Sequence, residues 1–156
     1  MCGLDNEYGV RAPFYNMEDG SVMSIFQFKA KHQSYPGRVH GGMITAMLDE
    51  LGMRALWVTQ QESLGVTTSL ETKYRRPVPY GTQLLGRGVI LMNHQRFLKA
   101  EAQILSLEGE VLAQAQLRYL KLTADEIEKG ISYHEEMCYL LHDEISELPF
   151  TAEAKI

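Results

Sequence analysis

The spacing of apolar residues predicts one long helix near the middle of the chain. From Gly42 to about Val58 these residues recur three, four and seven positions apart, as they do on a buried helix. They are Met43, Ile44, Met47, Leu48, Leu51, Ala55 and Leu56. Other apolar residues occupy the remaining sides, so we expect the helix to be largely buried. Glu50 and Arg54 are four positions apart and are expected to pair at an exposed edge.

Around this helix, runs with a period of two or with continuous apolar character predict five strands. They are expected at residues 21–30, 64–76, 82–93, 96–107 and 110–121. The fourth is expected to face the interior with Leu98, Ala100, Ala102 and Ile104, and the fifth with Val111, Ala113, Ala115, Leu117 and Tyr119. The Glu108-Gly109 step between these two strands suits a tight hairpin turn.

The strand at 64–76 is predicted to be half-buried and to alternate strictly between two faces. Val66, Leu70 and Tyr74 would lie on one face. Thr67 would lie on the polar face, together with Ser69, Glu71, Lys73 and Arg75. Pro77 and Pro79 end this strand.

A second helix is expected at about residues 123–146, because Thr123-Ala124-Asp125-Glu126 forms a capping-box start and apolar residues follow at helical spacing. The predicted order is a strand, a long buried helix, four antiparallel strands and a terminal helix. This order predicts an α+β fold in a single domain over residues 1–156, with its core at about 20–121. One helix cannot easily cover a long five-stranded sheet, so we expect the chain to pair with a second copy.

Composition limits the classes of function. The chain has 45% apolar and 22% charged residues, which is typical of a soluble globular domain. A net charge of -5 and 15 scattered Lys and Arg residues argue against nucleic acid as a partner. No stretch is apolar for long enough to span a membrane, and the N-terminus has no signal-peptide pattern, so we expect a cytoplasmic protein. Cys2 and Cys138 are expected to be free thiols, and neither a metal nor a cofactor is predicted.

The start of the long helix carries the first candidate chemistry. Gly41 and Gly42 would let a substrate carbonyl approach the unpaired backbone N–H groups of the first turn, which predicts an oxyanion hole. The alternative is that the two glycines only make a tight turn from loop to helix. Further along, Asp49 places a carboxylate in an apolar helix, where burial is costly unless the group is paired or used. Its alternatives are a solvated edge position or a hydrogen bond with Thr45.

The distance between these two features predicts a homodimer with active sites at the interface. Gly41 and Asp49 are eight residues apart, or about 12 Å along a helix. One small carbonyl cannot reach both in the same chain, so two subunits would have to contribute. Dimer and tetramer both remain open.

His40-Gly41-Gly42 followed by Asp49, together with residues 67–77, resembles the PaaI-type branch of the hotdog-fold thioesterase superfamily. The resemblance covers roughly residues 20–121. It implies a hotdog fold and hydrolysis of acyl-CoA thioesters. Asp49 would then be the general base or nucleophile, Gly41 or Gly42 would polarise the carbonyl, His40 would orient the loop or the carbonyl end, and Thr67 would assist.

The chain also departs from that pattern. Many relatives carry a water-positioning Asn six residues before the histidine, and Ser34 stands there, with Gln33 beside it. Either residue could substitute. Tyr74 is expected to shape the substrate pocket. Contacts to the phosphates of CoA could come from Arg75, Arg76, His94, Arg96 and Lys99, with Arg96 as the first choice.

Two other functions remain open at this stage. An acyl-thioester dehydratase or hydratase would use His40 and Asp49 of partner chains on opposite sides of the substrate. A noncatalytic hotdog protein would bind acyl-CoA without turning it over.

Overall fold

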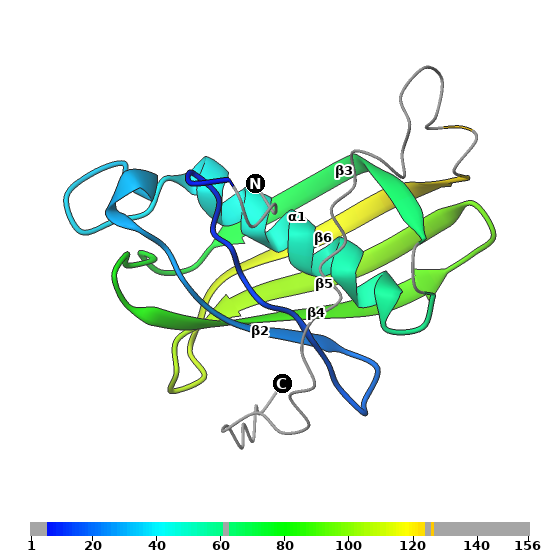
Figure 1. The fold of residues 1–156 in the computed structure, drawn as a ribbon, viewed down its shortest axis with the longest axis horizontal. Coiled ribbons are helices and arrows are strands. Elements are labelled where there is room, and N and C mark those ends of the chain that lie inside the picture. Colours follow the sequence, from blue (N-terminus) through cyan, green and yellow to red (C-terminus); the bar gives the residue numbers. More distant parts are fainter. Residues whose placement is uncertain (1–5, 61–62, 124–125, 127–156) are drawn as a thin grey trace.

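The computed structural model describes residues 6–60, 63–123 and 126. Of the helix predicted at about 123–146, only Thr123 and Glu126 belong to these residues, and the rest lies outside them. Figure 1 shows one long helix lying across one face of an antiparallel sheet. The predicted α+β architecture, with its buried central helix, is therefore confirmed for the described part of the chain.

The elements follow the predicted order, with two short additions before the long helix. Before the helix come β1 (Tyr15–Asn16), β2 (Val22–Gln27) and a 3-10 turn (Ala30–His32), and the helix is α1 (Gly41–Trp57). After it come β3 (Leu64–Tyr74), β4 (Gln83–Asn93), β5 (Phe97–Leu105) and β6 (Val111–Leu122). The sheet has six strands in the order β1-β2-β4-β5-β6-β3, so the predicted count of five was wrong. A two-residue strand such as β1 is too short to show a hydrophobic period.

The core lies between α1 and the inward face of the sheet. Leu48, Leu51 and Leu56 of the helix have no exposed surface. The inward residues of β5 are buried as predicted, and so are those of β6 from Ala113 to Tyr119. No helix within the described ranges is long and apolar enough to cross a membrane.

Glycines on β4 allow α1 to lie very close to the sheet. A Cβ atom at Gly88 would overlap the backbone carbonyl of Leu51. One at Gly86 would lie 2.8 Å from a methyl carbon of Leu51. On the helix side, Gly52 leaves room for the hydroxyl of Tyr119, which would be 2.5 Å from an added Cβ. This close contact fixes the height of the helix above the strands.

A bulge in β3 overturns the alternation predicted for that strand. Thr67 pairs with Tyr119, but Ser69 pairs with the next residue of β6, Arg118, so Thr68 is the extra residue. After the bulge, Leu70 and Tyr74 pair with the inward-facing Leu117 and Ala113. Thr67 and Tyr74 therefore both face α1, although strict alternation had placed them on opposite faces.

The N-terminal segment covers part of the outer side of α1. The guanidinium of Arg54 lies over the rings of Phe14 and Trp57, at 5.1 and 4.1 Å from their centroids. The same group forms the predicted pair with Glu50, at 2.8 Å. The pair is partly buried rather than at an exposed edge, because the segment around Phe14 packs beside it.

We expect Gly88→Ala to lower the free energy of unfolding by about 3 kcal/mol, because the backbone of α1 has to move to admit the methyl group. Gly65→Ala is the matched control, since the nearest atom there is the flexible Met53 thioether, at 3.2 Å. Chemical denaturation of both variants measures the difference. Equal losses would contradict the close packing of α1 on β4.

Candidate active site

His40 is the N-cap residue of α1, and its contacts determine which backbone N–H groups of the first turn are available. Its Nδ1 accepts a hydrogen bond from the N–H of Gly42, at 3.0 Å. Its carbonyl accepts from Met43 and Ile44, at 2.9 and 3.2 Å. The N–H of Gly41 has no acceptor among the described residues. The first turn also contains no acidic side chain, so its positive dipole end is not neutralised locally.

Asp49 lies two turns further along α1 and faces β3. The Thr67 hydroxyl lies 2.9 and 3.1 Å from its two carboxylate oxygens and donates to them. The side chain of Asp49 is partly exposed, so its charge is stabilised by this bond and by solvent. The structure brings together the carboxylate and the threonine that the resemblance had named.

The alternative partner for Asp49, Thr45, is occupied elsewhere. Its hydroxyl lies 2.7 Å from the hydroxyl of Tyr74 and 3.2 Å from that of Thr72. The Tyr74 hydroxyl also donates to the carbonyl of Gly41, at 3.1 Å. The helix stripe formed by Gly41, Thr45 and Asp49 is thus bonded along its length to β3.

A groove of about 490 Å³ opens beside the start of α1. It is lined by Ser34, Arg38, Val39, Gly41, Gly42, Ile44, Tyr74, Arg75, Arg76, Pro77 and Val78. Five residues expected at the site therefore share one groove, namely Ser34, Gly41, Gly42, Tyr74 and Arg75. Gln33 is adjacent, because it forms a β-bridge with Val39.

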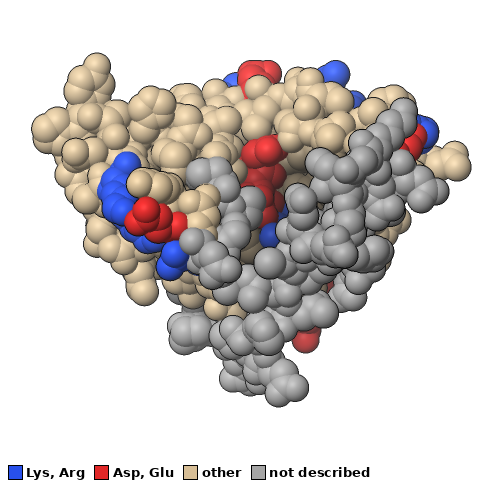
Figure 2. Space-filling view, turned by 45° about the horizontal axis from the view of Figure 1, so that its top comes forward, with Lys and Arg blue, Asp and Glu red and all other residues tan. Residues whose placement is uncertain are grey.

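The basic residues of this groove differ in how they are paired. Arg76 forms an ion pair with Glu110, at 3.0 Å. Within the described part of the chain, Arg38 and Arg75 have no carboxylate partner. Arg38 was not among the residues predicted at the site, since a single arginine in a loop carries no pattern. On the face drawn in Figure 2, acidic atoms emerge near the middle, and most of the basic atoms lie toward the margins.

Arg96 is not near this groove in its own chain. Its carbonyl accepts from Lys121 at the end of β6, far from the residue of β6 that pairs with Tyr74. Its guanidinium pairs with Glu126, at 3.0 Å. Its expected contact with CoA stays a prediction.

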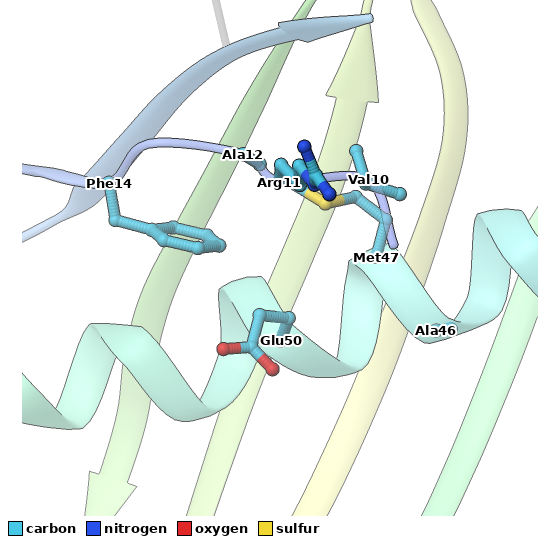
Figure 3. A pocket seen from close by; sticks show the side chains of 7 residues that line it. All are labelled: Val10, Arg11, Ala12, Phe14, Ala46, Met47 and Glu50. Atoms are coloured by element: carbon cyan, nitrogen blue, oxygen red, sulfur yellow. The ribbon is translucent and has the colours of Figure 1, made fainter. Parts of the chain in front are cut away.

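A second, smaller hollow lies between α1 and the N-terminal segment (Figure 3). It is lined by Val10, Arg11, Ala12, Phe14, Ala46, Met47 and Glu50. Figure 3 shows Met47 reaching from the helix toward Val10 and Arg11. The hollow is mainly apolar and was not foreseen, because residues 10–14 show no period typical of a helix or strand.

Tyr119 supports the helix beneath the candidate site. It is 1% exposed, and its hydroxyl donates to the backbone carbonyl of Asp49 at 2.8 Å. Burial, and then the negative charge of Asp49, raise the pKa of Tyr119 far above that of a free tyrosine. The buried phenol is therefore neutral in the folded protein and fixes the backbone that carries the carboxylate.

This fold and arrangement of residues define a known class. The profile of the Thioesterase superfamily matches residues 36–113, which is half of the chain. The chain belongs to this superfamily. Solved structures of similar fold include PaaI proteins, so the chain shares the hotdog fold of these thioesterases.

Individual relatives agree with this assignment. The chain is 30% identical to acyl-coenzyme A thioesterase THEM4 of Rattus norvegicus over 125 residues, or 79% of this chain and 51% of that protein. It therefore spans about half the length of the curated relatives that it matches.

Two solved structures show the same fold. A putative thioesterase of Ralstonia eutropha JMP134, described as phenylacetic acid degradation-related, superposes with a TM-score of 0.64 at 21% identity. That match covers 71% of this chain and 85% of the other. The PaaI protein of E. coli gives a TM-score of 0.65 at 14% identity, covering 73% and 81%.

The raised pKa of Tyr119 predicts a specific loss of stability in base. A tyrosine in the unfolded chain ionises near pH 10, whereas the folded Tyr119 stays neutral. Its contribution to stability is therefore complete below about pH 10 and is lost as the pH rises toward the folded-state pKa, by up to about 1.4 kcal/mol per pH unit.

Denaturation of the native protein and Tyr119→Phe between pH 8 and 11 measures this contribution. The native protein should be more stable by about 1 kcal/mol at pH 8, because of the bond to Asp49. It should lose that advantage above pH 10. A difference that stays constant up to pH 11 would show that Tyr119 ionises freely in the folded state.

Proposed function

We propose that the protein hydrolyses acyl-CoA thioesters, with Asp49 as the catalytic carboxylate. The observation that carries the proposal is the bond between Asp49 and Thr67 on a helix whose Gly41 N–H has no acceptor among the described residues. A carboxylate and an unpaired backbone donor are the two groups that thioester hydrolysis needs. Gly41 is favoured over Gly42 as the donor, because the Gly42 N–H is bonded to His40.

In this proposal, the hydrolysis proceeds through a tetrahedral intermediate. Asp49 takes a proton from a water molecule, the water oxygen attacks the thioester carbon, and the carbonyl oxygen becomes an anion. The Gly41 N–H and the positive end of the α1 dipole stabilise that anion. The C–S bond then breaks, and CoA leaves as a thiol after it receives the proton. Direct attack by Asp49 would instead form an acyl anhydride, which water then cleaves.

We propose a homodimer because one chain cannot bring both groups to the same carbonyl. Gly41 and Asp49 lie on one continuous helix, so the distance of about 12 Å between them is fixed. The outer edge of β3 has no strand beside it among the described residues. Val66 on this strand is 45% exposed. A long edge of this kind is a natural site for pairing with another chain.

Pairing of β3 with a second β3 would place the groups correctly. Two copies of one strand related by a two-fold axis perpendicular to the sheet run antiparallel. With the axis near Leu70, the Thr67 end of one strand lies beside the Tyr74 end of the other. Asp49 is bonded to Thr67, and Gly41 is bonded to Tyr74. Each site would then combine Asp49 of one chain with the Gly41 N–H of the other.

For the CoA portion, we propose that Arg38 and Arg75 contact phosphate groups. Both line the groove beside Gly41, and neither is paired with a carboxylate in the described part of the chain. Guanidinium groups bind phosphate oxygens with paired hydrogen bonds. A ligand with its thioester at Gly41 and its phosphates at the groove would run outward from the active site.

The dehydratase alternative has less support from the geometry. A dehydratase would need a histidine whose ring nitrogen is aimed at the substrate as an acid or base. One ring nitrogen of His40 is committed to the Gly42 N–H at the start of the helix. This bond supports the proposed role of His40 in orienting the loop and the start of the helix.

We expect Asp49→Ala to lower kcat by about 10²- to 10⁴-fold, because the general base is lost. The assay follows thiol release from a panel of short, medium, long and aryl acyl-CoAs. Glu50→Gln is the control and should retain activity, since this neighbouring carboxylate is engaged with Arg54. If the folded native protein binds acyl-CoA but releases no thiol from any of these, the protein is a binder rather than a thioesterase.

We expect Gly41→Pro to remove the oxyanion donor without unfolding the helix. Proline is well accepted at the first helical position, and His40, at φ -64 and ψ 134, has the conformation that precedes proline. We expect kcat to fall by about 10²- to 10³-fold. Gly41→Ala is the matched control, because it adds a side chain but keeps the N–H. Equal kcat values for the two variants would exclude the Gly41 N–H as the donor.

A further inference from the structure

The peptide unit between Gly41 and Gly42 is held at both ends by side chains. Its carbonyl accepts a hydrogen bond from the Tyr74 hydroxyl, at 3.1 Å. Its N–H donates to Nδ1 of His40, at 3.0 Å. One side chain comes from the end of β3 and the other from the residue before the helix. The plane of this peptide, and with it the orientation of the first helical turn, is thereby fixed from two directions.

The hydroxyl groups that end on this peptide form a directional chain. A carbonyl can only accept, so the single hydrogen of the Tyr74 hydroxyl is directed to Gly41. Thr45, at 2.7 Å, then has to donate to the Tyr74 oxygen, and Thr72, at 3.2 Å, can donate to Thr45. Hydrogen bonds in such a chain strengthen one another. This row of hydrogen bonds ties one turn of α1 to two positions of β3.

We infer that Tyr74 is a positioning residue for the oxyanion donor and that Thr45 supports it. This inference rests on the proposed thioesterase function. Tyr74 holds the Gly41–Gly42 peptide and the Gly42 N–H stays with His40, which leaves the N–H of Gly41, a residue that lines the groove, as the donor without an acceptor among the described residues. If this hold is lost, the first turn can rotate and the Gly41 N–H is aimed less accurately at the developing oxyanion.

The same contact explains why a glycine stands at position 41. A Cβ atom there would lie 3.2 Å from the Tyr74 hydroxyl oxygen and 3.4 Å from the ring carbon that bears it. The hydroxyl is therefore the atom that an added side chain would press against. A substitution at Gly41 should disturb the native protein more than a variant that lacks this hydroxyl.

Tyr74 is suited to a test by mutation because its removal does not empty the core. Its side chain is 53% exposed, and phenylalanine would keep the ring while removing the hydroxyl. Tyr35→Phe is the matched control, since Tyr35 is 75% exposed and its hydroxyl has no partner among the described residues. Thr45→Val and Thr45→Ser form a second pair, because both are close in size to threonine and only serine keeps the hydroxyl.

The kinetic experiment compares kcat and KM of the full chain with an acyl-CoA that the native protein hydrolyses. We expect Tyr74→Phe to lower kcat about tenfold, with KM changed less than about twofold, because the hydroxyl orients a donor used mainly in the transition state. Thr45→Val should lower kcat in the same way, and Thr45→Ser should restore it. Unchanged kcat in Tyr74→Phe, or a loss confined to KM, would overturn the inference.

A second measurement does not depend on activity. Amide NMR of the native protein and Tyr74→Phe reports the Gly41 and Gly42 N–H groups directly. We expect both resonances to shift and the Gly42 N–H to exchange faster with solvent, whereas Tyr35→Phe should leave both unchanged. If the native protein hydrolyses no thioester, the proposed function fails and the NMR result alone decides whether Tyr74 holds the peptide. Unperturbed glycine amides in Tyr74→Phe would show that it does not.

Discussion

The close packing of α1 on the sheet is the constraint on which the candidate site depends. Glycines at 86 and 88 bring the helix down onto β4, and this height lets its polar stripe reach β3. Gly41 and Asp49 each meet a hydroxyl of that strand. Without this approach, the carboxylate would have only solvent as a partner, and the helix start would not be oriented.

A rigid helix also limits what a single chain can do. The N–H of Gly41 and the carboxylate of Asp49 lie at opposite ends of an eight-residue interval that cannot bend, because the core fixes the residues between them. Each group has the local contacts that its proposed role needs, but the two groups are too far apart to act on one carbonyl. Within the described part of the chain, the outer edge of β3 has no neighbouring strand and lies beside both groups, so in the proposed dimer a second copy would complete the site there.

Much of this architecture could be predicted from the sequence, because the long helix and four of the strands have clear hydrophobic periods. The bulge at Thr68 could not, since an extra residue in a strand leaves no compositional signal and reverses the face of every later residue. For the same reason, strict alternation placed Thr67 on the opposite face from Tyr74, although both face α1. Asp49, Gly41 and Gly42 could be predicted as site residues, because a carboxylate in an apolar helix and two glycines at the start of that helix stand out in the sequence.

In the proposed dimer each active site combines Asp49 of one chain with Gly41 of another, and a mixture of two inactive variants tests this arrangement. Asp49→Ala and Gly41→Pro would be unfolded together and refolded as a mixture. In a mixed dimer, one site carries both defects and the other carries neither, so the account predicts recovery of about a quarter of native activity when subunits exchange randomly. If mixed dimers form and remain as inactive as the parents, both groups act within one chain and the account is contradicted.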